Sequence, residues 1–441
     1  MTTVSEHSGA ADSLRVGDEV VIEAGPIAHG GFVVARHQGR VLFVRHALPG
    51  EEVRARITEG GPGDRFLRAD AVAVLRPSPD RVEPPCPYAG PGLCGGCDFQ
   101  HVAVREQRSL KAAVVEEQLR RLAGVDLAVT VEAVPGDVEG LRWRTRTEFA
   151  VDDSGRAGMR RHRSHDLIVI DDCLIAREDV VGTGVLQGHW PDEKAVDVVA
   201  PSVGPAVVVR VPSDEPTAPV VTEKVAAQAL SREFDVSARG FWQVHLGASA
   251  TFVDAVISGL QPRPGERGLD LYAGVGVFAS ALAEAVGPEG QVVAVESDAT
   301  AVTQARLNVE RTPWVHYIQG RVDHVFGVES TGRVAGSRRG RRRTGPRRPH
   351  SQLPPSADIV VLDPPRTGAG KAVVEAVVAL GARALAYVAC DPAAFARDTA
   401  YLMERGYALT SLRAFDAFPM THHIECVAIF RPRERDVRDE T

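Results

Sequence analysis

The stretch that decides the fold is LDLYAGVGVFA, residues 269–279. An apolar run of strand composition ends in a glycine turn, and helix-forming residues follow at once. A strand, a glycine turn and a helix start are typical of the first unit of a doubly wound α/β sheet, where a cofactor lies at the carboxyl ends of the strands. We therefore predict an α/β fold, with Tyr272, Gly274 and Gly276 as cofactor contacts.

The rest of the C-terminal half repeats the strand–helix pattern. Helices between successive strands indicate a parallel, doubly wound sheet. Two later β-rich runs, residues 407–409 and 424–430, can close the sheet as an antiparallel edge pair. The predicted parallel strands are residues 268–271, 292–296, 315–318, 359–363 and 385–388.

The glycine loop leaves the identity of the cofactor open. Glu296 ends the next strand, twenty residues after Gly276, where an acid suits hydrogen bonds to a ribose diol. The spacing Gly274-x-Gly276-x-x-Ala279 also satisfies the dinucleotide fingerprint. The motif by itself therefore fits NAD as well as S-adenosylmethionine.

Cys390 is the candidate nucleophile. It ends the apolar run of AYVACDP, residues 386–392, where a helix is expected to start. A thiol at a strand end, near the positive end of a helix, is placed to have its pKa lowered and to act as a nucleophile. The alternative is a buried cysteine that behaves as a small hydrophobe.

Two acids accompany this thiol at predicted strand ends. Asp363 opens the loop DPPRTG, and Glu425 stands beside Cys426 in an otherwise apolar run. Taken alone, Glu425 also fits a surface carboxylate. A thiolate that adds to C6 of uracil makes C5 reactive toward a methyl donor, and a base must then remove the C5 proton. Cys390 and Glu425 can fill these two roles.

The N-terminal part is predicted to be a small β-barrel. Five short β-rich runs punctuated by glycine turns lie within residues 15–76, as in OB-like barrels, which often bind nucleic acid. A structural module without a ligand fits the same pattern. The net charge of −7 argues weakly against whole-surface attraction to nucleic acid. No apolar run is long enough for a membrane span and no signal peptide is recognisable, so we expect a cytoplasmic protein.

A cysteine cluster predicts a metal centre. Cys86, Cys94 and Cys97 show the spacing C-x₇-C-x₂-C, and Cys173 is a distant fourth candidate ligand. Four thiolates suit a [4Fe–4S] cluster or tetrahedral zinc. Zinc sites usually show two C-x₂-C knuckles and only one is present, so the cluster is favoured.

Two arginine-rich segments have more than one interpretation. RWRTRTEF, residues 142–149, places three arginines on one face of a predicted strand, either as an RNA surface or as a solvated face. Residues 331–350 hold eight arginines and no acid, and their composition predicts a disordered insertion. This insertion fits a solvated basic loop better than an accessory RNA contact.

Several motifs in order resemble the RNA uracil-C5 methyltransferase family. CDPAAFARD at 390–398 resembles its catalytic cysteine motif, and FPMTHHIE at 418–425 resembles the motif that carries its proposed base. FWQV at 241–244 and DPPR at 363–366 resemble two further segments. The resemblance implies S-adenosylmethionine as cofactor, Cys390 as nucleophile and Glu425 as base. It also implies Gln243 as a contact to the cofactor and Asp363 as the residue that positions the target base and the methyl donor.

The N-terminal half narrows the resemblance to one branch. The glycine pattern of residues 25–51 resembles the TRAM domain of RNA-modifying enzymes. A TRAM domain together with four cluster cysteines resembles the branch that methylates 23S ribosomal RNA, whereas the tRNA branch generally lacks both. His245, Val277 and Arg321 depart from the family pattern around the cofactor, so contacts to the methyl donor are expected to differ there.

We therefore predict an S-adenosylmethionine-dependent enzyme that makes 5-methyluridine in RNA, with 23S rRNA favoured over tRNA. An NAD-dependent oxidoreductase and a non-catalytic RNA-binding protein are the alternatives. We expect a monomer with no obligate protein partner and no membrane contact. The expected organisation is a tail at 1–14, a TRAM-like barrel at 15–76, a small α+β iron–sulfur domain at 77–235, a class I methyltransferase domain at 236–431 and a tail at 432–441. The helix at 105–123 is expected to pack on the methyltransferase domain.

Overall fold

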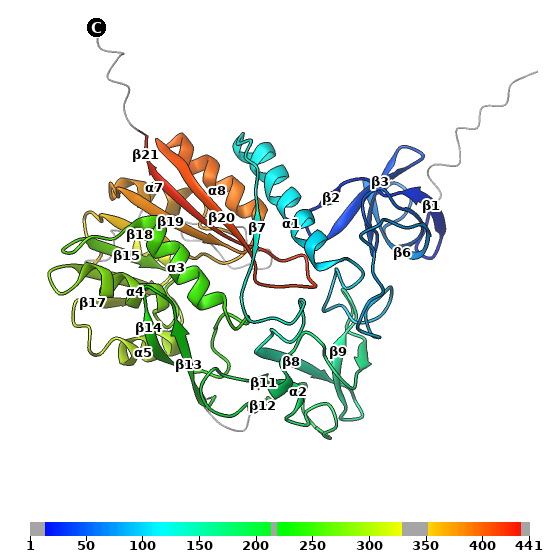
Figure 1. Ribbon diagram of the computed structural model, residues 1–441, viewed down its shortest axis with the longest axis horizontal. Coiled ribbons are helices and arrows are strands. Elements are labelled where there is room, and N and C mark those ends of the chain that lie inside the picture. The colour runs from blue at the N-terminus through cyan, green and yellow to red at the C-terminus, as the bar shows by residue number, and fades with distance from the viewer. Residues whose placement is uncertain (1–13, 213–217, 329–351, 434–441) are drawn as a thin grey trace, which may run out of the picture.

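The computed structural model describes residues 14–212, 218–328 and 352–433, which form three regions around separate sheets (Figure 1). The arginine-rich insertion expected at 331–350 lies outside the described residues. The two expected tails do so as well, apart from Leu14, Pro432 and Arg433.

The N-terminal region is a six-stranded sheet in the order β1-β5-β6-β4-β3-β2, around a hydrophobic core of its own. Alternation places Val53, Ala55 and Ile57 of β5 inside the core. The sequence missed β2, because two residues are too short for a periodic signal. The strands are β1 (Glu19–Glu23), β2 (Ile27–Ala28), β3 (Phe32–His37), β4 (Arg40–Arg45), β5 (Glu52–Glu59) and β6 (Phe66–Arg76).

The central region is a five-stranded antiparallel sheet in the order β10-β9-β8-β11-β12, beside the cysteine-rich loops. Trp143 and Phe149 are its largest fully buried side chains. Its elements are β8 (Arg146–Val151), β9 (Ala157–Arg160), β10 (Leu167–Val169), the short helix α2 (Glu178–Val181), β11 (Ala195–Val199) and β12 (Val207–Val211).

The C-terminal region is an eight-stranded sheet in the order β17-β16-β15-β18-β19-β21-β20-β7. The five predicted parallel strands are confirmed, and so are the two antiparallel strands, although these two do not form the edge of the sheet. Strand β7 pairs parallel with β20 at the edge, although it precedes the central region in the chain. The strands are β7 (Val131–Ala133), β15 (Arg267–Leu271), β16 (Gln291–Glu296), β17 (Val315–Gln319), β18 (Ile359–Leu362), β19 (Ala384–Ala389), β20 (Tyr407–Asp416) and β21 (Glu425–Pro432).

Helices cover both faces of this sheet and bury two hydrophobic clusters against it, as in doubly wound folds. The hairpin of β13 (Val220–Ala226) and β14 (Ser231–Ser237) shares one of these clusters through Phe234 and Val236. The expected domain boundary at 235/236 therefore cuts through a hairpin that packs on the C-terminal core. The helices are α3 (Ala248–Leu260), α4 (Val277–Val286), α5 (Ala299–Asn308), α6 (Val322–Val325), α7 (Lys371–Ala379) and α8 (Pro392–Glu404).

Helix α1 (Val104–Gln118), continued by the π-helical turn η1 (Leu119–Ala123), joins the first and last regions. It stands beside α8 and β20 (Figure 1), and Val115 and Leu119 are buried in the C-terminal core. Lys111 of α1 donates to Asp416 at the end of β20 over 2.5 Å, and both side chains are almost fully buried. Burial lowers the pKa of Lys111, and Asp416 opposes that shift. The pair thus links α1 to the end of β20.

No helix within the described ranges is both long and apolar enough to cross a membrane.

Replacing Lys111 with methionine should destabilise the protein strongly. Asp416 would keep only Arg108, at 3.4 Å, as an ion-pair partner, so a buried charge would lose its closest compensation. We expect a loss of about 3 kcal/mol in urea unfolding. The matched control is Arg121→Met, which breaks the exposed pair with Glu117 and should cost less than about 0.5 kcal/mol. Equal unfolding midpoints for the two variants would contradict this role of Lys111.

Candidate active site

The predicted site residues of the C-terminal region gather at the carboxyl ends of neighbouring parallel strands. Leu271 of β15 pairs with Leu362 of β18, so the positions that follow, Tyr272 and Asp363, lie side by side. The Asp363 amide donates to the Leu271 carbonyl over 3.2 Å. Glu296 ends β16 on the other side of β15. The residues that the sequence placed at this edge of the sheet are therefore neighbours in the structure.

The glycine loop has one open glycine and one packed glycine. A Cβ at Gly276 would stand 2.0 Å from the Tyr317 hydroxyl oxygen, and its φ of +93° favours glycine. A Cβ at Gly274 would meet no atom within 4 Å. Glu296 accepts from the Gly274 amide over 2.9 Å. Close packing at Gly276 and the hydrogen bond of the Gly274 amide thus fix the loop. The space beside the Gly274 Cα is open, so a cofactor could approach the backbone there.

The backbone conformation of Tyr272 and the burial of Asp270 are two features of the site that the sequence did not predict. Tyr272 has a left-handed backbone with φ of +67°, a strained conformation that often occurs at functional sites. Asp270, which the sequence did not single out, is fully buried, and neither carboxylate oxygen has a hydrogen-bond partner. Burial, assisted by the neighbouring Asp363, raises the pKa of Asp270 to about 8. A carboxyl group held this way would gain from a cation or a donor in the crevice.

Strand pairing brings the proposed nucleophile and base together. Ala389 of β19 pairs with Cys426 of β21, so the next position of this antiparallel ladder places Cys390 opposite Glu425. Directly opposite residues lie on the same face, with Cβ atoms about 4.5–5.5 Å apart. Glu425 is 4% exposed, so it is not a surface carboxylate.

The expectation of a lowered pKa for Cys390 is wrong. Asp391 caps α8 by accepting from the Ala394 amide, so the thiol does lie at a helix start. Burial nevertheless raises the pKa of Cys390 to about 12, and the charges of Glu425 and Asp363 add to the shift, with Arg366 opposing it. Desolvation and two acids outweigh the helix end, so the free protein holds a thiol rather than a thiolate.

Burial also favours the neutral form of the two carboxyl groups near Cys390. Burial raises the pKa of Asp363 to about 7. Burial also raises the pKa of Glu425 well above its ordinary value, with a further contribution from Asp363. Two acids and a thiol share one poorly solvated space, and acidic groups this close do not ionise together. The site is therefore arranged to receive positive charge.

A buried carboxylate supports the loop that carries Asp363. Asp398 of α8 is fully buried and accepts from the amides of Ala369 and Gly370 and from the Tyr387 hydroxyl, over 2.7, 3.1 and 2.6 Å. Because Tyr387 lies on β19, this network joins the Asp363 loop to the strand that ends at Cys390. Asp398 appears in the quoted cysteine motif, but nothing in its spacing predicts this role.

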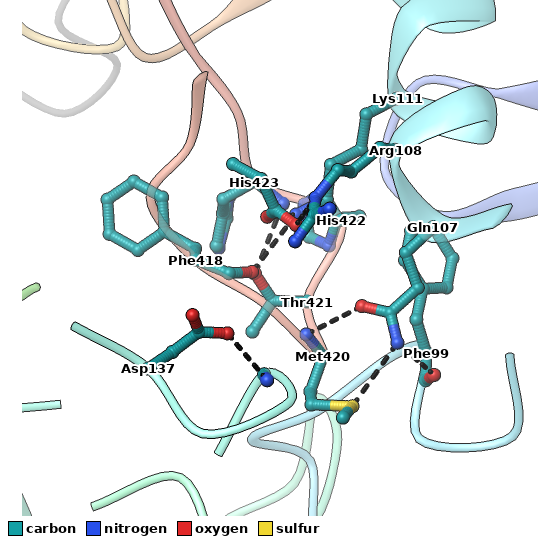
Figure 2. A network of polar contacts seen from close by, with 12 residues as sticks. Phe99, Gln107, Arg108, Lys111, Asp137, Phe418, Met420, Thr421, His422 and His423 are labelled. Carbon is teal, nitrogen blue, oxygen red and sulfur yellow. Dashed lines mark hydrogen bonds and ion pairs between the residues drawn. The ribbon is translucent and has the colours of Figure 1, made fainter. Parts of the chain in front are cut away.

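Residues from the N-terminal half of the chain form hydrogen bonds with the loop between β20 and β21 and hold it in place (Figure 2). Gln107 of α1 accepts from the Met420 amide over 2.8 Å and donates to the Phe99 and Val102 carbonyls. Asp98 lies 2.6 Å from His422 Nδ1 and accepts from the His422 amide over 3.2 Å. The loop before the proposed base is thus held by residues more than three hundred positions away.

A cavity of about 110 Å³ opens above Cys390. It is smaller than the roughly 300–1,000 Å³ of drug-sized ligand pockets, and its size suits a single planar ring. Arg366 lies 3.1 Å from His423 Nε2 at its wall. The lining residues come from the N-terminal sheet (Ile27, His29, Gly30, Gly31), from the region of α1 (Phe99, Leu110, Lys111, Val114) and from the catalytic loops (Arg366, Cys390, Asp391, Pro392, His422, His423, Ile424).

Gln243, the predicted cofactor contact, lies in a segment fixed by the central region. Thr145 donates both its amide and its hydroxyl to the Val244 carbonyl, over 2.8 and 3.0 Å. His245 is 2% exposed and stacks on Trp143 with ring centroids 5.8 Å apart. The departure from the family pattern at His245 is therefore a packing feature of this chain.

The four predicted cluster cysteines converge in the central region. Burial raises the pKa of Cys97, and the nearby Cys173, Cys94 and Cys86 add to that shift. Cys94 is likewise influenced by Cys173 and Cys86. Within the described ranges, however, no group of three or more His, Cys, Asp or Glu side chains is arranged to hold a metal ion.

The arginines of residues 142–149 form neither a free RNA surface nor a solvated face. Arg142 forms an ion pair with Asp172 over 2.6 Å. Arg146, only 10% exposed, pairs with Glu223 over 3.0 Å and donates to three backbone carbonyls. Because Glu223 lies on β13, Arg146 fastens the central sheet to the C-terminal region, whereas Arg142 and Asp172 both belong to the central region. Alternation along a strand could not reveal these acidic partners.

Comparison with known proteins agrees with this geometry. Residues 221–433 match the family model described as tRNA (Uracil-5-)-methyltransferase. An uncharacterized RNA methyltransferase of Streptomyces avermitilis is 46% identical, over 95% of this chain and 99% of the relative. A 23S rRNA (uracil(1939)-C(5))-methyltransferase of Vibrio parahaemolyticus is 28% identical, over 91% of this chain and 93% of the relative.

A solved structure shares the fold. The tRNA (uracil-54, C5)-methyltransferase of Pyrococcus abyssi, in complex with S-adenosyl-L-homocysteine, has a TM-score of 0.63 at 19% identity. The match covers 93% of this chain and all of that one, 100%. The likeness therefore extends beyond the C-terminal sheet.

Proposed function

Since the chain belongs to the RNA uracil-C5 methyltransferase family and is an S-adenosylmethionine-dependent RNA methyltransferase, we propose that Cys390 and Glu425 perform the transfer on a uridine of 23S rRNA. The observation that carries this proposal is the ladder of β19 and β21, which sets Cys390 opposite a buried Glu425 beneath a ring-sized cavity. Neither an NAD-dependent oxidoreductase nor a non-catalytic RNA-binding protein has a use for this pair.

The proposed reaction begins at Cys390. Its sulfur adds to C6 of a uracil that has been flipped out of the RNA stack, and C5 gains nucleophilic character as an enolate. S-adenosylmethionine, when bound, would supply the methyl group to C5, and its sulfur–methyl bond would break to release S-adenosylhomocysteine. Glu425 then takes the proton from C5, the C5–C6 double bond re-forms, and Cys390 leaves as a thiolate. The ring recovers its aromatic-like form, and the methyl group replaces one hydrogen.

The raised pKa values are compatible with this chemistry when the cofactor is bound. The sulfonium of S-adenosylmethionine is a cation, and a positive charge close to Asp363 and Glu425 favours their ionised forms. Burial holds Glu425 protonated in the free protein, so its role as a base depends on the arrival of that charge. The same charge lowers the cost of a thiolate at Cys390. Activation would thus follow cofactor binding.

The cofactor contacts are part of the proposal. The open space in front of Gly274 can receive the cofactor against the backbone. Glu296 uses one oxygen for the Gly274 amide and the other for the Ser297 and Asp298 amides, so its remaining lone pairs would serve the ribose. We assign Gln243, Tyr272, Gly274, Gly276, Glu296 and Asp363 to the cofactor.

We assign the N-terminal sheet, residues 15–76, to a TRAM-like barrel, and the five-stranded sheet with the cysteine-rich loops to a central domain. The expected range 77–235 of that domain also contains β7 and most of the β13–β14 hairpin, which pack with the C-terminal region. The Vibrio parahaemolyticus relative, which acts on 23S rRNA, supports rRNA, whereas the Pyrococcus abyssi structural neighbour acts on tRNA. Mass-spectrometric mapping of 5-methyluridine in RNA from a strain lacking the gene decides between them. Loss of the modification from 23S rRNA is expected, and loss from tRNA alone would contradict the assignment.

A [4Fe–4S] cluster on Cys86, Cys94, Cys97 and Cys173 also belongs to the proposal. The sulfurs that bind one zinc ion lie roughly 3.8 Å apart, whereas in a cluster each cysteine binds a different iron. The convergence of four thiols would supply one ligand for each iron of such a cluster.

Replacing Cys390 with alanine should abolish methyl transfer, at least about a thousandfold, because no other group can form the C6 bond. Glu425→Gln should permit addition and methyl transfer but block proton removal, so a covalent RNA–protein adduct should accumulate. Labelled methyl transfer and denaturing gels measure the two effects. Cys426→Ala, a buried neighbour in the same sheet, is the control thiol and should keep turnover. Turnover by Cys390→Ala would exclude the mechanism.

Affinity for S-adenosylmethionine should rise as pH increases through about 7. A raised pKa leaves the Asp363 carboxyl neutral below that pH and charged above it, and only the charged form attracts the sulfonium. Titration calorimetry from pH 6 to pH 8 measures the slope. S-adenosylhomocysteine lacks the sulfonium charge and should show a smaller slope. A slope that persists in Asp363→Asn would contradict this assignment.

Anaerobically purified protein should contain iron and acid-labile sulfide in equal amounts, with a broad visible absorption. Cys97→Ser should lose both, since it removes one of the four ligands. Cys426→Ala leaves these cysteines intact and should retain the iron. One zinc per chain without iron would refute the cluster.

A further inference from the structure

The loop of residues 29–31 follows β2 in the N-terminal sheet and enters the active-site cavity. His29, Gly30 and Gly31 line the same space as Cys390 and Asp391. The N-terminal sheet, which is expected to bind RNA, thus also supplies part of the wall around the Cys390 thiol. The contacts of this loop indicate what it does there.

His29 contacts the residue that follows the nucleophile. Its Nε2 lies 3.2 Å from one carboxylate oxygen of Asp391, and the other oxygen accepts from the Ala394 amide over 2.8 Å. One carboxylate therefore caps α8 and holds the N-terminal loop at the same time. Because Asp391 adjoins Cys390 in the chain, this contact acts one residue away from the sulfur.

Gly31 makes the second contact, by close packing. A Cβ there would stand 2.9 Å from the Cβ of His422 and 3.5 Å from that of Asp98. The Gly31 φ of +78° disfavours other residues independently of this contact. His422 belongs to the loop that leads to Glu425. The N-terminal loop therefore touches the segments of both the proposed nucleophile and the proposed base.

A third contact fixes the N-terminal sheet behind this loop. Arg45, at the end of β4, lies 3.2 Å from Asp98, and both side chains are at most one-tenth exposed. Asp98 in turn holds His422 over 2.6 Å. Such a charged, buried chain of contacts fixes geometry more firmly than a surface ion pair does. The position of residues 29–31 over the cavity is therefore set by several independent contacts.

We propose that residues 29–31 form one wall of the target-uridine pocket and contribute to the chemical step. His29 is the positioning residue that orients Asp391 and, through it, the Cys390 thiol. This inference rests on the proposed function of Cys390. The N-terminal sheet then contributes to the chemical step, in addition to any contribution to RNA affinity.

The test uses two variants of the full-length chain with two matched controls. His29→Ala removes the Asp391 contact, and His37→Ala removes a histidine of β3 in the same sheet that does not line the cavity. Gly31→Ala adds a methyl group against His422. Gly39→Ala pays the same kind of backbone strain, with φ of +84°, but meets no atom within 4 Å.

The readout is single-turnover methyl transfer to total RNA from a strain lacking the gene, which offers every natural substrate. At saturating RNA, His29→Ala should lower the rate constant about fivefold, because a partly exposed contact to a carboxylate is lost. Gly31→Ala should lower it about tenfold through misplacement of the catalytic loops. His29→Gln, whose amide can still donate to Asp391, should recover most of the rate. Both controls should stay within about twofold of the wild type.

The outcomes separate this inference from the proposed function. If the wild type transfers no methyl group to the RNA, the proposed function fails. If the wild type is active and both variants match their controls at saturating RNA, residues 29–31 have no role in the chemical step. A loss that appears only at low RNA concentration would assign the loop to RNA affinity and overturn the inference as well. Binding of S-adenosylmethionine by each variant shows that the variant is folded. If Gly31→Ala does not fold, the comparison of His29→Ala with His37→Ala tests the inference.

Discussion

The buried ion pair of Lys111 and Asp416 is the contact on which the arrangement of the active site depends. It fastens α1 to the end of β20, just before the loop that leads to Glu425. Lys111 also donates to the Phe418 carbonyl over 3.0 Å, so the loop is held at its first turn. An ammonium group without water needs its carboxylate partner, and the chain can satisfy both only in this geometry. The site is therefore built from both halves of the chain.

The electrostatics of the pocket explain why reactivity would wait for ligands. Asp363, Glu425 and Cys390 each have a raised pKa, and burial is the main cause for all three. A free enzyme with a permanent thiolate would be open to oxidation and to unwanted addition reactions. In this arrangement the cationic cofactor brings a positive charge into the pocket when the target uracil is also bound there. The protonated forms of these three groups thus keep the free enzyme unreactive until its ligands bind.

The sequence predicted the parallel strands, the crevice and the residues at its edge, because periodicity and glycine turns are local signals. It could not predict the contacts that set the geometry. His29 and Asp391 stand 362 positions apart, and Arg146 pairs with Glu223 on a strand that no spacing connects to it. The raised pKa of Cys390 was not predictable for the same reason: the helix start is visible in the sequence, but the burial of the thiol and its two neighbouring carboxyl groups result from the fold. Local patterns show which residues can react, and long-range packing decides how they are placed.

The central claim is that the Cys390 sulfur bonds to the target uracil. RNA containing 5-fluorouridine tests it directly, because fluorine at C5 cannot be removed as a proton and the adduct cannot break down by elimination. The protein is incubated with this RNA and S-adenosylmethionine, and the cross-linked peptide is identified by mass spectrometry. We predict one RNA-bearing peptide, modified at Cys390 with the methyl group already transferred. A cross-link at another residue, or methylation of normal RNA without any trapped adduct, would contradict the account.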